Sequence, residues 1–522
     1  MFADLPEALR AHAAERPGVV AVESGGRSLT YEGLDDRSDR FARALVAMGV
    51  VRGERVAFLA KTCIEYFEYL VGTIKAGAVP VPVNWRLAVP EIVEVVSDAE
   101  AVVLVVDDEY IDRIVGVSDR LPGVRRIIPL SAHDGLVSWT ELLDQYALGQ
   151  PVDAPVAADA VVLQIYTSGT TGRPKGVMTS SGGFLSYLSS LADVARFEPG
   201  SISLSTMPLF HIGGTGWAVA GLYRGATTLL LRDVDPDLIL DTVEQRRVTN
   251  LIAVPSVVLM LLNSPRLATN DFSSLDYLYY GGGPMTQSIL QRALDAFDCE
   301  FVQGFGMTEC PLITSLTPAD HLLDRALLRS CGRPIGDTVV RLVDPETGTD
   351  VERGTVGEMW VRSPQGFAGY WKQPAVSAQT LVDGEWLRTG DAALMDDQGY
   401  LFLQDRVKDM IVSGGENVYP AEVENALVSH PGVRECAVIG VPSEKWIETV
   451  KAVVIREPGS DVGESELIAF CKSLLAGYKC PTTIDFVDQL PRTPSGKVVK
   501  FELREFYRKT SAENRHEQHA EA

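Results

Sequence analysis

The hydrophobic positions along the chain form short, mostly apolar runs. Such runs are typical of buried strands in parallel sheets, and six occur between residues 55 and 256: RVAFLA, AVPVPVN, AVVLVVDD, AVVLQIYTSG, TTLLLRD and NLIAVPS. Ahead of them, residues 28–50 begin as a strand and continue as an amphipathic helix, with Leu34, Phe41, Leu45 and Met48 near one face. Apolar runs alternate with helical patterns from about residue 30 to 440, which predicts α/β layers with parallel strand pairing.

The pattern changes twice towards the C-terminus. From about residue 335 to 405, Gly and Asp turns separate the short β segments VVRLVDP, GEMWVRS and GYLFLQD, which predicts a small β-rich lobe. Beyond DRVKDMIVSGGENVYP, helices and strands alternate in an α+β pattern. The expected fold is therefore mixed α/β and α+β: a large N-terminal domain of layered α/β subdomains with the β-rich lobe, and a small mobile C-terminal domain. The expected boundaries are 1–405 for the N-terminal domain, 406–409 for a hinge, 410–508 for the C-terminal domain and 509–522 for a disordered tail.

The charge balance and the cysteines limit the classes of function. The 522 residues include 47 basic and 70 acidic side chains, a net charge of −23, which argues against binding to nucleic acid or an anionic membrane. The seven cysteines form no C-x-x-C pair, which favours a reducing compartment. The N-terminus has no signal-peptide pattern, and the longest apolar run, 251–262, is interrupted by Pro255. We therefore expect a cytoplasmic protein with no integral membrane span.

The loop YTSGTTGRPKG, residues 166–176, interrupts the hydrophobic pattern. Its glycines let backbone N–H groups approach an anion, its hydroxyls add donors, and Lys175 adds a positive charge. These features suit a polyphosphate. The loop follows a predicted strand and is expected at its carboxyl end, where open α/β sheets bind ligands. A flexible connector is an alternative interpretation. A Walker A loop is excluded, because Gly176 follows Lys175 where Ser or Thr is required.

The same loop resembles the signature of the adenylate-forming superfamily, and further motifs follow in that family's order. They are MPLFHIGG (207–214), YYGGGPM (279–285), QGFGMTE (303–309), RTGD (388–391), DRVKDMIVSGGENVYPAEVE (405–424) and PRTPSGKVVK (491–500). The resemblance covers about residues 28–505, and the DRVKDMI and GGENVYP segments are most similar to the fatty-acyl and aryl-CoA ligase branch. A family of this kind implies Mg²⁺ as cofactor and ATP and CoA as co-substrates.

The resemblance implies an ATP site and a catalytic group of four residues. Thr167 and Glu309 would hold Mg²⁺, His211 would line the carboxylate end of the acid pocket, and Lys497 would bridge the acid and the α-phosphate. Phe305 would stack on adenine in place of the family's more frequent Tyr, and Asp391 would bind the ribose. The ATP-binding residues that it implies are Thr167, Ser168, Gly169, Thr170, Thr171, Lys175, Gly281, Gly282, Gly283, Gln303, Gly304, Phe305, Gly306, Met307, Thr308, Asp391, Arg406 and Lys497.

The resemblance also implies a mobile C-terminal domain. Lys497 would have to reach the site for adenylation and withdraw for thiol attack, with a rotation at Lys408. In the second position Gly414 and Gly415 would line a pantetheine tunnel. The remaining CoA contacts would come from Arg86, Trp446 and Tyr478.

The implied activity is that of an acid–thiol ligase in lipid metabolism. It would convert a hydrophobic acid, first a fatty acid and second an aromatic acid, through an acyl-AMP to an acyl-CoA. An adenylating enzyme that loads an external carrier protein is an alternative. A non-catalytic acyl or nucleotide binder is disfavoured, because Lys497, Glu309 and Asp391 are all present. A homodimer is left open. Apolar residues near the presumed acid pocket are Ile252, Ala253, Val254, Val257 and Trp217.

Overall fold

The structure, a computed structural model, describes most of the chain. For residues 287, 288, 404–406, 417 and 421 it describes the backbone alone. The described residues are 2–152, 156–167, 174–283, 285, 287–323, 327–344, 347–406, 411–418, 420–443, 445–491, 498, 500 and 502–508.

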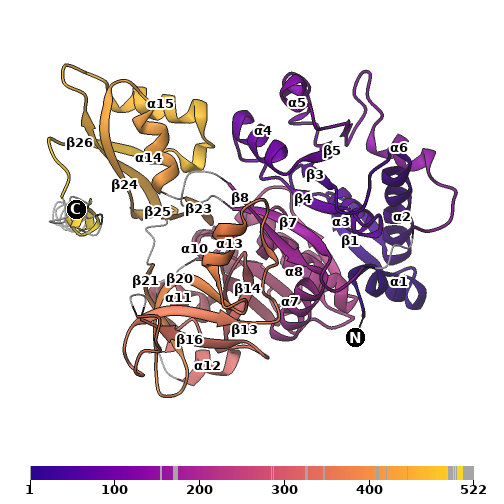
Figure 1. Cartoon of the computed structure of the whole chain (residues 1–522). Helices are drawn as coiled ribbons and strands as arrows, with labels where there is room; N and C mark the ends of the chain where they lie inside the picture. The colour runs from indigo at the N-terminus through magenta and orange to yellow at the C-terminus, as the bar shows by residue number, and fades with distance from the viewer. Residues whose placement is uncertain are drawn as a thin grey trace. The chain divides into compact units, whose positions relative to one another are not determined.

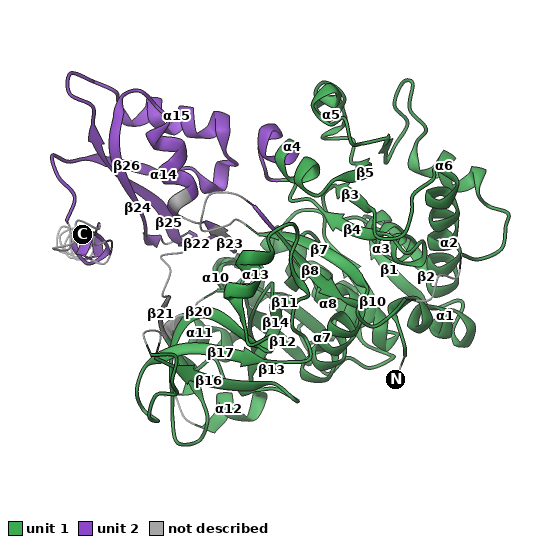
Figure 2. Cartoon of the chain, in the orientation of Figure 1, with its two compact units in different colours: residues 1–85, 93–167, 176–405 green, residues 86–92, 168–175, 406–522 purple. Residues whose placement is uncertain are grey.

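The chain divides into two compact units (Figure 2). Unit 1 comprises residues 1–85, 93–167 and 176–405, and unit 2 comprises 86–92, 168–175 and 406–522. No sequence pattern had assigned the two short segments 86–92 and 168–175 to the unit that contains the C-terminal residues. The hinge at 406–409 stays a prediction, because most of it lies outside the described residues.

A nine-stranded sheet forms the main layer of unit 1 (Figure 1). The six strands from β13 to β1 in the spatial order pair in parallel, whereas β2, β14 and β15 are antiparallel to their neighbours. The spatial order is β15 (Arg333–Pro334), β14 (Cys310–Leu316), β13 (Glu300–Met307), β12 (Tyr277–Gly281), β11 (Asn250–Ala253), β9 (Ile202–Ser205), β10 (Thr227–Leu230), β1 (Val20–Ser24) and β2 (Arg27–Thr30).

Helices cover both faces of this sheet, and alternate strand residues face opposite layers. Ile252 packs with helices α7 (Ser181–Val194) and α8 (Ile212–Arg224), whereas its neighbour Leu251 packs with the layer of the other face. The second layer contains α9 (Pro236–Gln245), α10 (Pro255–Asn263) and α11 (Gln287–Ala296). The predicted strand NLIAVPS ends at Ala253, because Pro255 is the first residue of α10, a position that proline favours.

A four-stranded parallel sheet forms a second layer of unit 1, in the order β4, β3, β5, β6. The amphipathic pattern of residues 28–50 forms β2 and α2, where Leu34, Phe41 and Leu45 are buried and Met48 follows the last helical residue. The elements of this region are α1 (Leu5–Glu15), α2 (Tyr31–Ala47), β3 (Arg55–Leu59), α3 (Glu65–Lys75), β4 (Val79–Pro82), α4 (Val89–Asp98), β5 (Ala101–Val106), α5 (Ile111–Val115), β6 (Arg126–Pro129) and α6 (Trp139–Gln145).

The predicted strand ahead of the YTSGTTGRPKG loop does not belong to a parallel α/β sheet. It forms β7 (Val161–Thr167), which lies beside β8 (Lys175–Ser180) in a sheet completed by β18 (Gly369–Tyr370). The loop therefore connects neighbouring strands of one small sheet, which corrects its predicted place at the edge of an open α/β sheet.

The β-rich lobe is a five-stranded sheet in which β20 is central. Its order is β16, β17, β20, β19, and β21 also pairs with β20. The sequence analysis did not predict β20, which contains the RTGD motif. The lobe and the adjacent helices comprise α12 (Pro318–Leu323), β16 (Val339–Val343), β17 (Gly357–Arg362), α13 (Pro374–Thr380), β19 (Leu381–Val382), β20 (Trp386–Met395) and β21 (Leu401–Arg406).

The C-terminal residues of unit 2 form the predicted α+β domain. Strands β24 and β25 are antiparallel, β26 is parallel to β25, and β22 and β23 form a hairpin. The elements are β22 (Ile411–Ser413), β23 (Glu416–Val418), α14 (Pro420–Val428), β24 (Val433–Ser443), β25 (Ile447–Arg456), α15 (Glu464–Leu474), a 3₁₀ helix η4 (Gly477–Lys479) and β26 (Thr483–Phe486). The predicted fold class, a large α/β domain with a small α+β domain, is confirmed.

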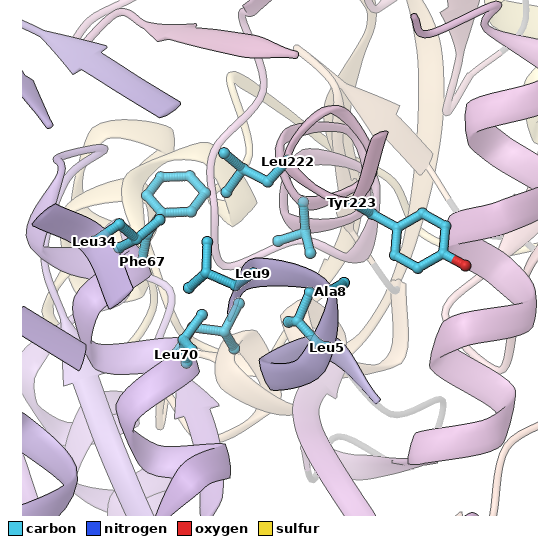
Figure 3. Close-up of a pocket in the computed structure, with 10 residues that line it drawn as sticks. Leu5, Ala8, Leu9, Leu34, Phe67, Leu70, Leu222 and Tyr223 are labelled. Carbon is cyan, nitrogen blue, oxygen red and sulfur yellow. The ribbon is translucent and has the colours of Figure 1, made fainter. Parts of the chain in front are cut away.

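A small apolar cavity of about 10 Å³ lies in unit 1, between α1, α2, α3 and α8 (Figure 3). Its carbon lining and its size, close to that of one water molecule, give it no means to bind a substrate. It lies towards the end of α8 that is remote from His211. The lining residues are Leu5, Ala8, Leu9, Leu34, Phe67, Leu70, Val71, Val219, Leu222 and Tyr223.

Two further expectations concern cysteines and membrane spans. All seven cysteines lie in described segments and are free thiols, and burial raises the pKa of several, as at Cys310, where it reaches about 12. Over the described residues, no helix is both long enough and apolar enough to cross a membrane.

Candidate functional site

The loops that follow four parallel strands meet at the carboxyl edge of the nine-stranded sheet. These strands are β9, β11, β12 and β13, which lie next to one another in that sheet. The chain leaves β9 towards β10 on one side, and later returns past β9 to β11 on the other side. The direction of winding thus reverses at β9, and ligands of open α/β sheets bind in the crevice at such a reversal.

His211 lies at this edge, at the start of α8. It is the N-cap residue of the helix, with extended backbone angles, and Thr215 donates a backbone hydrogen bond to its carbonyl group. Its ring contacts Phe210, with 4.5 Å between the ring centroids. Thr206 donates a hydrogen bond of 2.7 Å to the carbonyl of Ile252, which ties the loop after β9 to β11. The segment that leads from β9 to His211 is therefore tied to both strands at which the winding reverses.

The glycines of YYGGGPM bring the backbones of β12 and β13 close together. A Cβ atom on Gly281 would lie 2.4 Å from the carbonyl oxygen of Gly304, so that no side chain fits there. Gly282 has a φ of 75°, in the left-handed region that favours glycine. Gly283 is the next residue and is half-buried. The end of β12 is thus a stretch of backbone without side chains, along which a flat group could lie.

The QGFGMTE motif forms the end of β13 and the tight turn into β14. Met307 pairs with Cys310 across the turn made by Thr308 and Glu309, and the register shifts between Phe305 and Met307. Phe305 is half-buried and packs against the apolar core of the β-rich lobe. Gln303 and Gly304 lie opposite Tyr280 and Gly281 in the register with β12. A Cβ atom on Gly306 would lie 2.2 Å from the carbonyl oxygen of Pro311, which excludes other residues.

Glu309 is buried at the turn between β13 and β14, with 7% of its surface exposed. Tyr370 Oη donates a hydrogen bond of 2.5 Å to its carboxylate. Tyr370 belongs to β18, and it pairs with Val177 of β8, two residues after Lys175. Tyr370 thus links the carboxylate of Glu309, a predicted metal ligand, to the small sheet whose strands β7 and β8 flank the YTSGTTGRPKG loop.

Two residues of the YTSGTTGRPKG loop are described. Thr167 is the last residue of β7 and Lys175 is the first of β8, and both are half-buried. The residues between Thr167 and Pro174 lie outside the described part of the chain, and these include the predicted ATP-binding residues Ser168, Gly169, Thr170 and Thr171. The predicted hinge residue Lys408 and the predicted catalytic residue Lys497 also lie outside it.

The RTGD motif lies within β20, and its aspartate is buried. Asp391 is 6% exposed, and its backbone N–H donates to Thr389 Oγ1 at 3.1 Å. Burial raises the pKa of the Cys331 thiol to about 12, and the charge of Asp391 contributes to this shift. Arg388 forms a 2.7 Å ion pair with the buried Glu358. Of Arg406, the last residue of β21, only the backbone is described.

The residues predicted to bind CoA all belong to unit 2. Gly414 and Gly415 have φ values of 59° and 81° and form the two-residue turn between β22 and β23, as a type I′ hairpin requires. A Cβ atom on Gly414 would lie 2.9 Å from the Trp446 ring. Arg86 forms an ion pair with Glu416, the residue that follows this turn. Tyr478 is half-buried in η4.

Several residues that support the site were missed by the sequence analysis. Tyr370 holds Glu309, and Glu358 holds Arg388. Neither Tyr370 nor Glu358 has a sequence signal, because each acts through a long-range contact that only the folded chain shows. Thr389, within the RTGD motif, links Asp391 to the carbonyl of Met359. Trp217 and Ile252 pack on the α8 side of the sheet, whereas Ala253, Val254 and Val257 pack on the other side. The five apolar residues proposed for the acid pocket therefore do not line one space.

Two family models match nearly the whole chain. The model described as AMP-binding enzyme matches residues 9–371, and the model described as AMP-binding enzyme C-terminal domain matches residues 422–497. The chain belongs to the AMP-binding enzymes. The resemblance to the adenylate-forming superfamily is thereby confirmed, and AMP-binding enzymes of this branch are acid–thiol ligases that use ATP and form AMP.

Relatives among the AMP-binding enzymes differ in the acids and acceptors that their names give. Fatty acid--[acyl-carrier-protein] ligase ScoC of Streptomyces coeruleorubidus is 38% identical over 95% of this chain and 94% of its own. Feruloyl-CoA synthase of an Amycolatopsis species is 40% identical over 94% of this chain and 96% of its own. Amide bond synthetase McbA of Marinactinospora thermotolerans has a similar structure, with a TM-score of 0.88 and 31% identity over 97% of this chain and all of its own.

Proposed function

We propose that the protein activates a hydrophobic carboxylic acid with ATP and transfers the acyl group to CoA. In the first half-reaction, a carboxylate oxygen attacks the α-phosphorus, the bond to pyrophosphate breaks, and an acyl-AMP forms. In the second, the CoA sulfur attacks the acyl carbon, the bond to AMP breaks, and the thiol proton passes to solvent. The acyl-AMP is needed because AMP is a far better leaving group than the oxide of a free carboxylate.

The observation that carries this proposal is the meeting of the motifs at one edge of the nine-stranded sheet. His211, the glycines 281–283 and Glu309 follow β9, β12 and β13, which together with β11 are four consecutive parallel strands of this sheet. In the proposal, adenine lies along the glycines beside Phe305, and the ribose hydroxyls donate to Asp391, with Arg406 as support. The triphosphate lies at Lys175 and the residues 167–171, and the acid carboxylate lies beside His211.

Glu309 and Thr167 suit a magnesium ion bound together with ATP. Mg²⁺ prefers oxygen ligands and is usually held by one or two side chains together with substrate phosphates. Over the described residues, no cluster of three or more His, Cys, Asp or Glu side chains could hold a metal ion, so the phosphates would complete its coordination. Bound there, the ion would neutralise phosphate charge. Tyr370 orients the carboxylate of Glu309 for this purpose.

Lys497 is proposed as the cation that bridges the acid and the α-phosphate, and Lys408 as the hinge. Gly414, Gly415, Arg86, Trp446 and Tyr478 are proposed to contact CoA. The grouping of Arg86, Glu416, Gly414 and Trp446 within unit 2 supports a shared role for these residues. The cytoplasmic location remains a proposal, and the homodimer remains open.

The test is an acid-dependent exchange of labelled pyrophosphate into ATP, followed by discharge of the acyl-AMP. The proposal expects exchange with hydrophobic acids in the absence of CoA, and AMP release that then depends on CoA. The second candidate is transfer to a carrier protein, which the similarity to ScoC favours. Discharge by a purified acyl-carrier protein and not by CoA would replace the first candidate with the second. Absence of exchange over a broad acid panel would refute both.

A further inference from the structure

Three aromatic side chains fill the region beneath His211, on the α8 side of the nine-stranded sheet. We call them the aromatic floor: Tyr187 of α7, Trp217 of α8 and Tyr279 of β12, which are 3%, 0% and 7% exposed. The centroids of the Trp217 and Tyr279 rings lie 5.4 Å apart. Tyr187 Oη donates to the carbonyl of Ile212, the residue after His211, at 3.4 Å. The floor is therefore connected to the residue next to His211, at the proposed carboxylate end of the acid.

Two glycines make room for this floor. A Cβ atom on Gly216 would lie 2.1 Å from Tyr187 Oη, and a Cβ atom on Gly304 would lie 1.6 Å from Tyr279 Oη. The tyrosine rings thus occupy space that side chains would fill at these positions. Since the interior of a folded protein is packed at the density of a crystal, these rings block the continuation of an acid pocket in their directions.

The floor contains a buried hydrogen-bond donor that has no partner among the described residues. Trp217 Nε1 has no hydrogen-bond acceptor within the segments that the structure describes, although the residue is fully buried. Buried indole N–H groups nearly always have a partner, so an exception needs an explanation. Ser205 Oγ, at the carboxyl end of β9, is also unpartnered within the described part of the chain, and the residue is 1% exposed.

Ser205 and Trp217 lie in the same layer. The Cβ atom of Ser203 is 3.8 Å from the place where a Cβ atom on Gly221 of α8 would lie, so Ser203 faces α8. Residues two positions apart in a strand face the same side, which places Ser205 on this side as well. Ser203 Oγ is itself unpartnered among the described residues, so three unpartnered polar groups lie between β9 and α8, inside an apolar and aromatic surrounding.

Trp217 lies further along α8 than the proposed carboxylate end of the acid. It follows the N-cap residue His211 by six residues, which corresponds to about 9 Å along the helix axis at 1.5 Å per residue. An acid that begins at His211 and ends at the level of Trp217 is compact, whereas a long unbranched acyl chain would extend well past the floor.

We propose that the acid is a compact aryl acid with a hydrogen-bond acceptor at the ring position remote from its carboxylate. This inference rests on the proposed function, and it chooses among the acids that the function allows. Trp217 Nε1 donates a hydrogen bond to the acceptor on the acid, and Ser205 Oγ makes a second polar contact with it. Tyr187 and Tyr279 pack beside the aryl ring of the acid and limit the length of acid that fits. Trp217 is thus a specificity-determining residue.

The test compares matched acids and one conservative variant. Acid- and CoA-dependent AMP release is measured with cinnamate, 4-hydroxycinnamate and 4-methoxycinnamate, and with straight-chain acids from hexanoate to hexadecanoate. The wild type is expected to favour both substituted cinnamates over cinnamate in kcat/KM by about 3- to 10-fold, the size of one neutral hydrogen bond. Trp217→Phe keeps a ring and removes the N–H, so it is expected to abolish this preference, measured as the ratio of kcat/KM for the substituted cinnamates to kcat/KM for cinnamate in the same variant.

Trp139→Phe is the matched control. Trp139 is also buried, but its Nε1 donates to Glu68 at 2.6 Å in another part of unit 1. Thermal unfolding of both variants is measured to verify that they are folded. The control is expected to keep the wild-type preference for substituted cinnamates over cinnamate. An equal loss on all cinnamates in Trp217→Phe, an unchanged preference, or a higher kcat/KM for long chains than for cinnamates would overturn this inference alone. Absence of AMP release with every acid would overturn the proposed function as well.

Discussion

The hydrogen bond between Tyr370 and Glu309 should set the efficiency of adenylation. Tyr370→Phe removes a single hydroxyl group, and the ring can stay in place among its buried neighbours. A hydrogen bond to a charged acceptor contributes about 1.5–3 kcal/mol. Since about 1.4 kcal/mol corresponds to a tenfold change, kcat/KM for MgATP should fall about 10- to 100-fold if this bond holds the carboxylate in its working orientation.

Tyr400→Phe is a closely matched control for this variant. Tyr400 Oη donates a 2.6 Å hydrogen bond to the buried carboxylate of Asp320, so the same chemical group is lost from a similar setting. Asp320 lies in α12, and none of the motifs that form the site includes it. Both variants should lose a similar free energy of unfolding, measured by denaturant titration.

The assay is acid-dependent pyrophosphate exchange over a range of Mg²⁺ concentrations. Tyr370→Phe should need more Mg²⁺ for half-maximal rate, because Glu309 is no longer held by its donor. Tyr400→Phe should retain the wild-type Mg²⁺ dependence. Equal exchange rates and equal Mg²⁺ dependence in the two variants would refute the role assigned to Tyr370.

Three further predictions address catalysis and stability. Lys497→Ala should lower adenylation by about 10²–10³-fold and spare CoA transfer from preformed acyl-AMP in single-turnover assays; equal damage to both halves would contradict the two-position scheme. Burial lowers the pKa of His321, so below about pH 6.5 the unfolded chain binds more protons than the folded chain, and the free energy of unfolding falls. The His321→Gln variant should therefore lose less free energy of unfolding than the wild type between pH 7 and pH 5 in denaturant titrations. An equal loss in the two proteins would count against this prediction. Burial alone would lower the pKa of Lys479, but the charges of Tyr478, Glu422 and Glu91 outweigh it and raise this pKa. Lys479→Met removes the ion pairs with Glu91 and Glu422 and should destabilise unit 2 by about 3–5 kcal/mol. An unchanged melting temperature in scanning calorimetry would show that these ion pairs contribute nothing.

Much of the fold could be predicted from local patterns. The runs at residues 55–60 and 101–108 form strands β3 and β5, because a fully apolar segment of this length has to be buried on both faces. The helix α14 and strand β24 also follow their patterns. Strand β20 was missed because RTGD contains a Gly–Asp pair, which in isolation indicates a turn. In the structure the pair lies at an irregularity of the β17–β20 register, where Gly390 has a φ of 73° and the strand continues on both sides.

The site could be predicted in part, because its motifs are local whereas its supporting contacts are not. His211, Gly281 and Glu309 were identified from short segments, and the sheet order explains why they meet. Tyr370 lies 61 residues from Glu309 in the sequence, and no pattern connects the two. The aromatic floor was also not predicted: only Trp217 of its three residues had been considered for the acid pocket, and the floor favours the aromatic acid that the sequence analysis ranked second.

The alternation of side chains along β11 explains why the apolar residues of the run 251–262 do not line one acid pocket. Consecutive residues of a strand face opposite sides of a sheet. Ile252 therefore belongs to the layer of Trp217, while Ala253 belongs to the opposite layer. A list of neighbouring apolar residues cannot define a pocket in a sheet that is covered on both faces.

The central claim is that the acid's carboxylate attacks the α-phosphorus of ATP. Its most direct test is one turnover with an acid labelled with ¹⁸O in both carboxyl oxygens, followed by mass spectrometry of the nucleotide and the phosphates. The account predicts AMP that carries one ¹⁸O atom, together with unlabelled pyrophosphate. Unlabelled AMP, or label in inorganic phosphate with release of ADP, would contradict it.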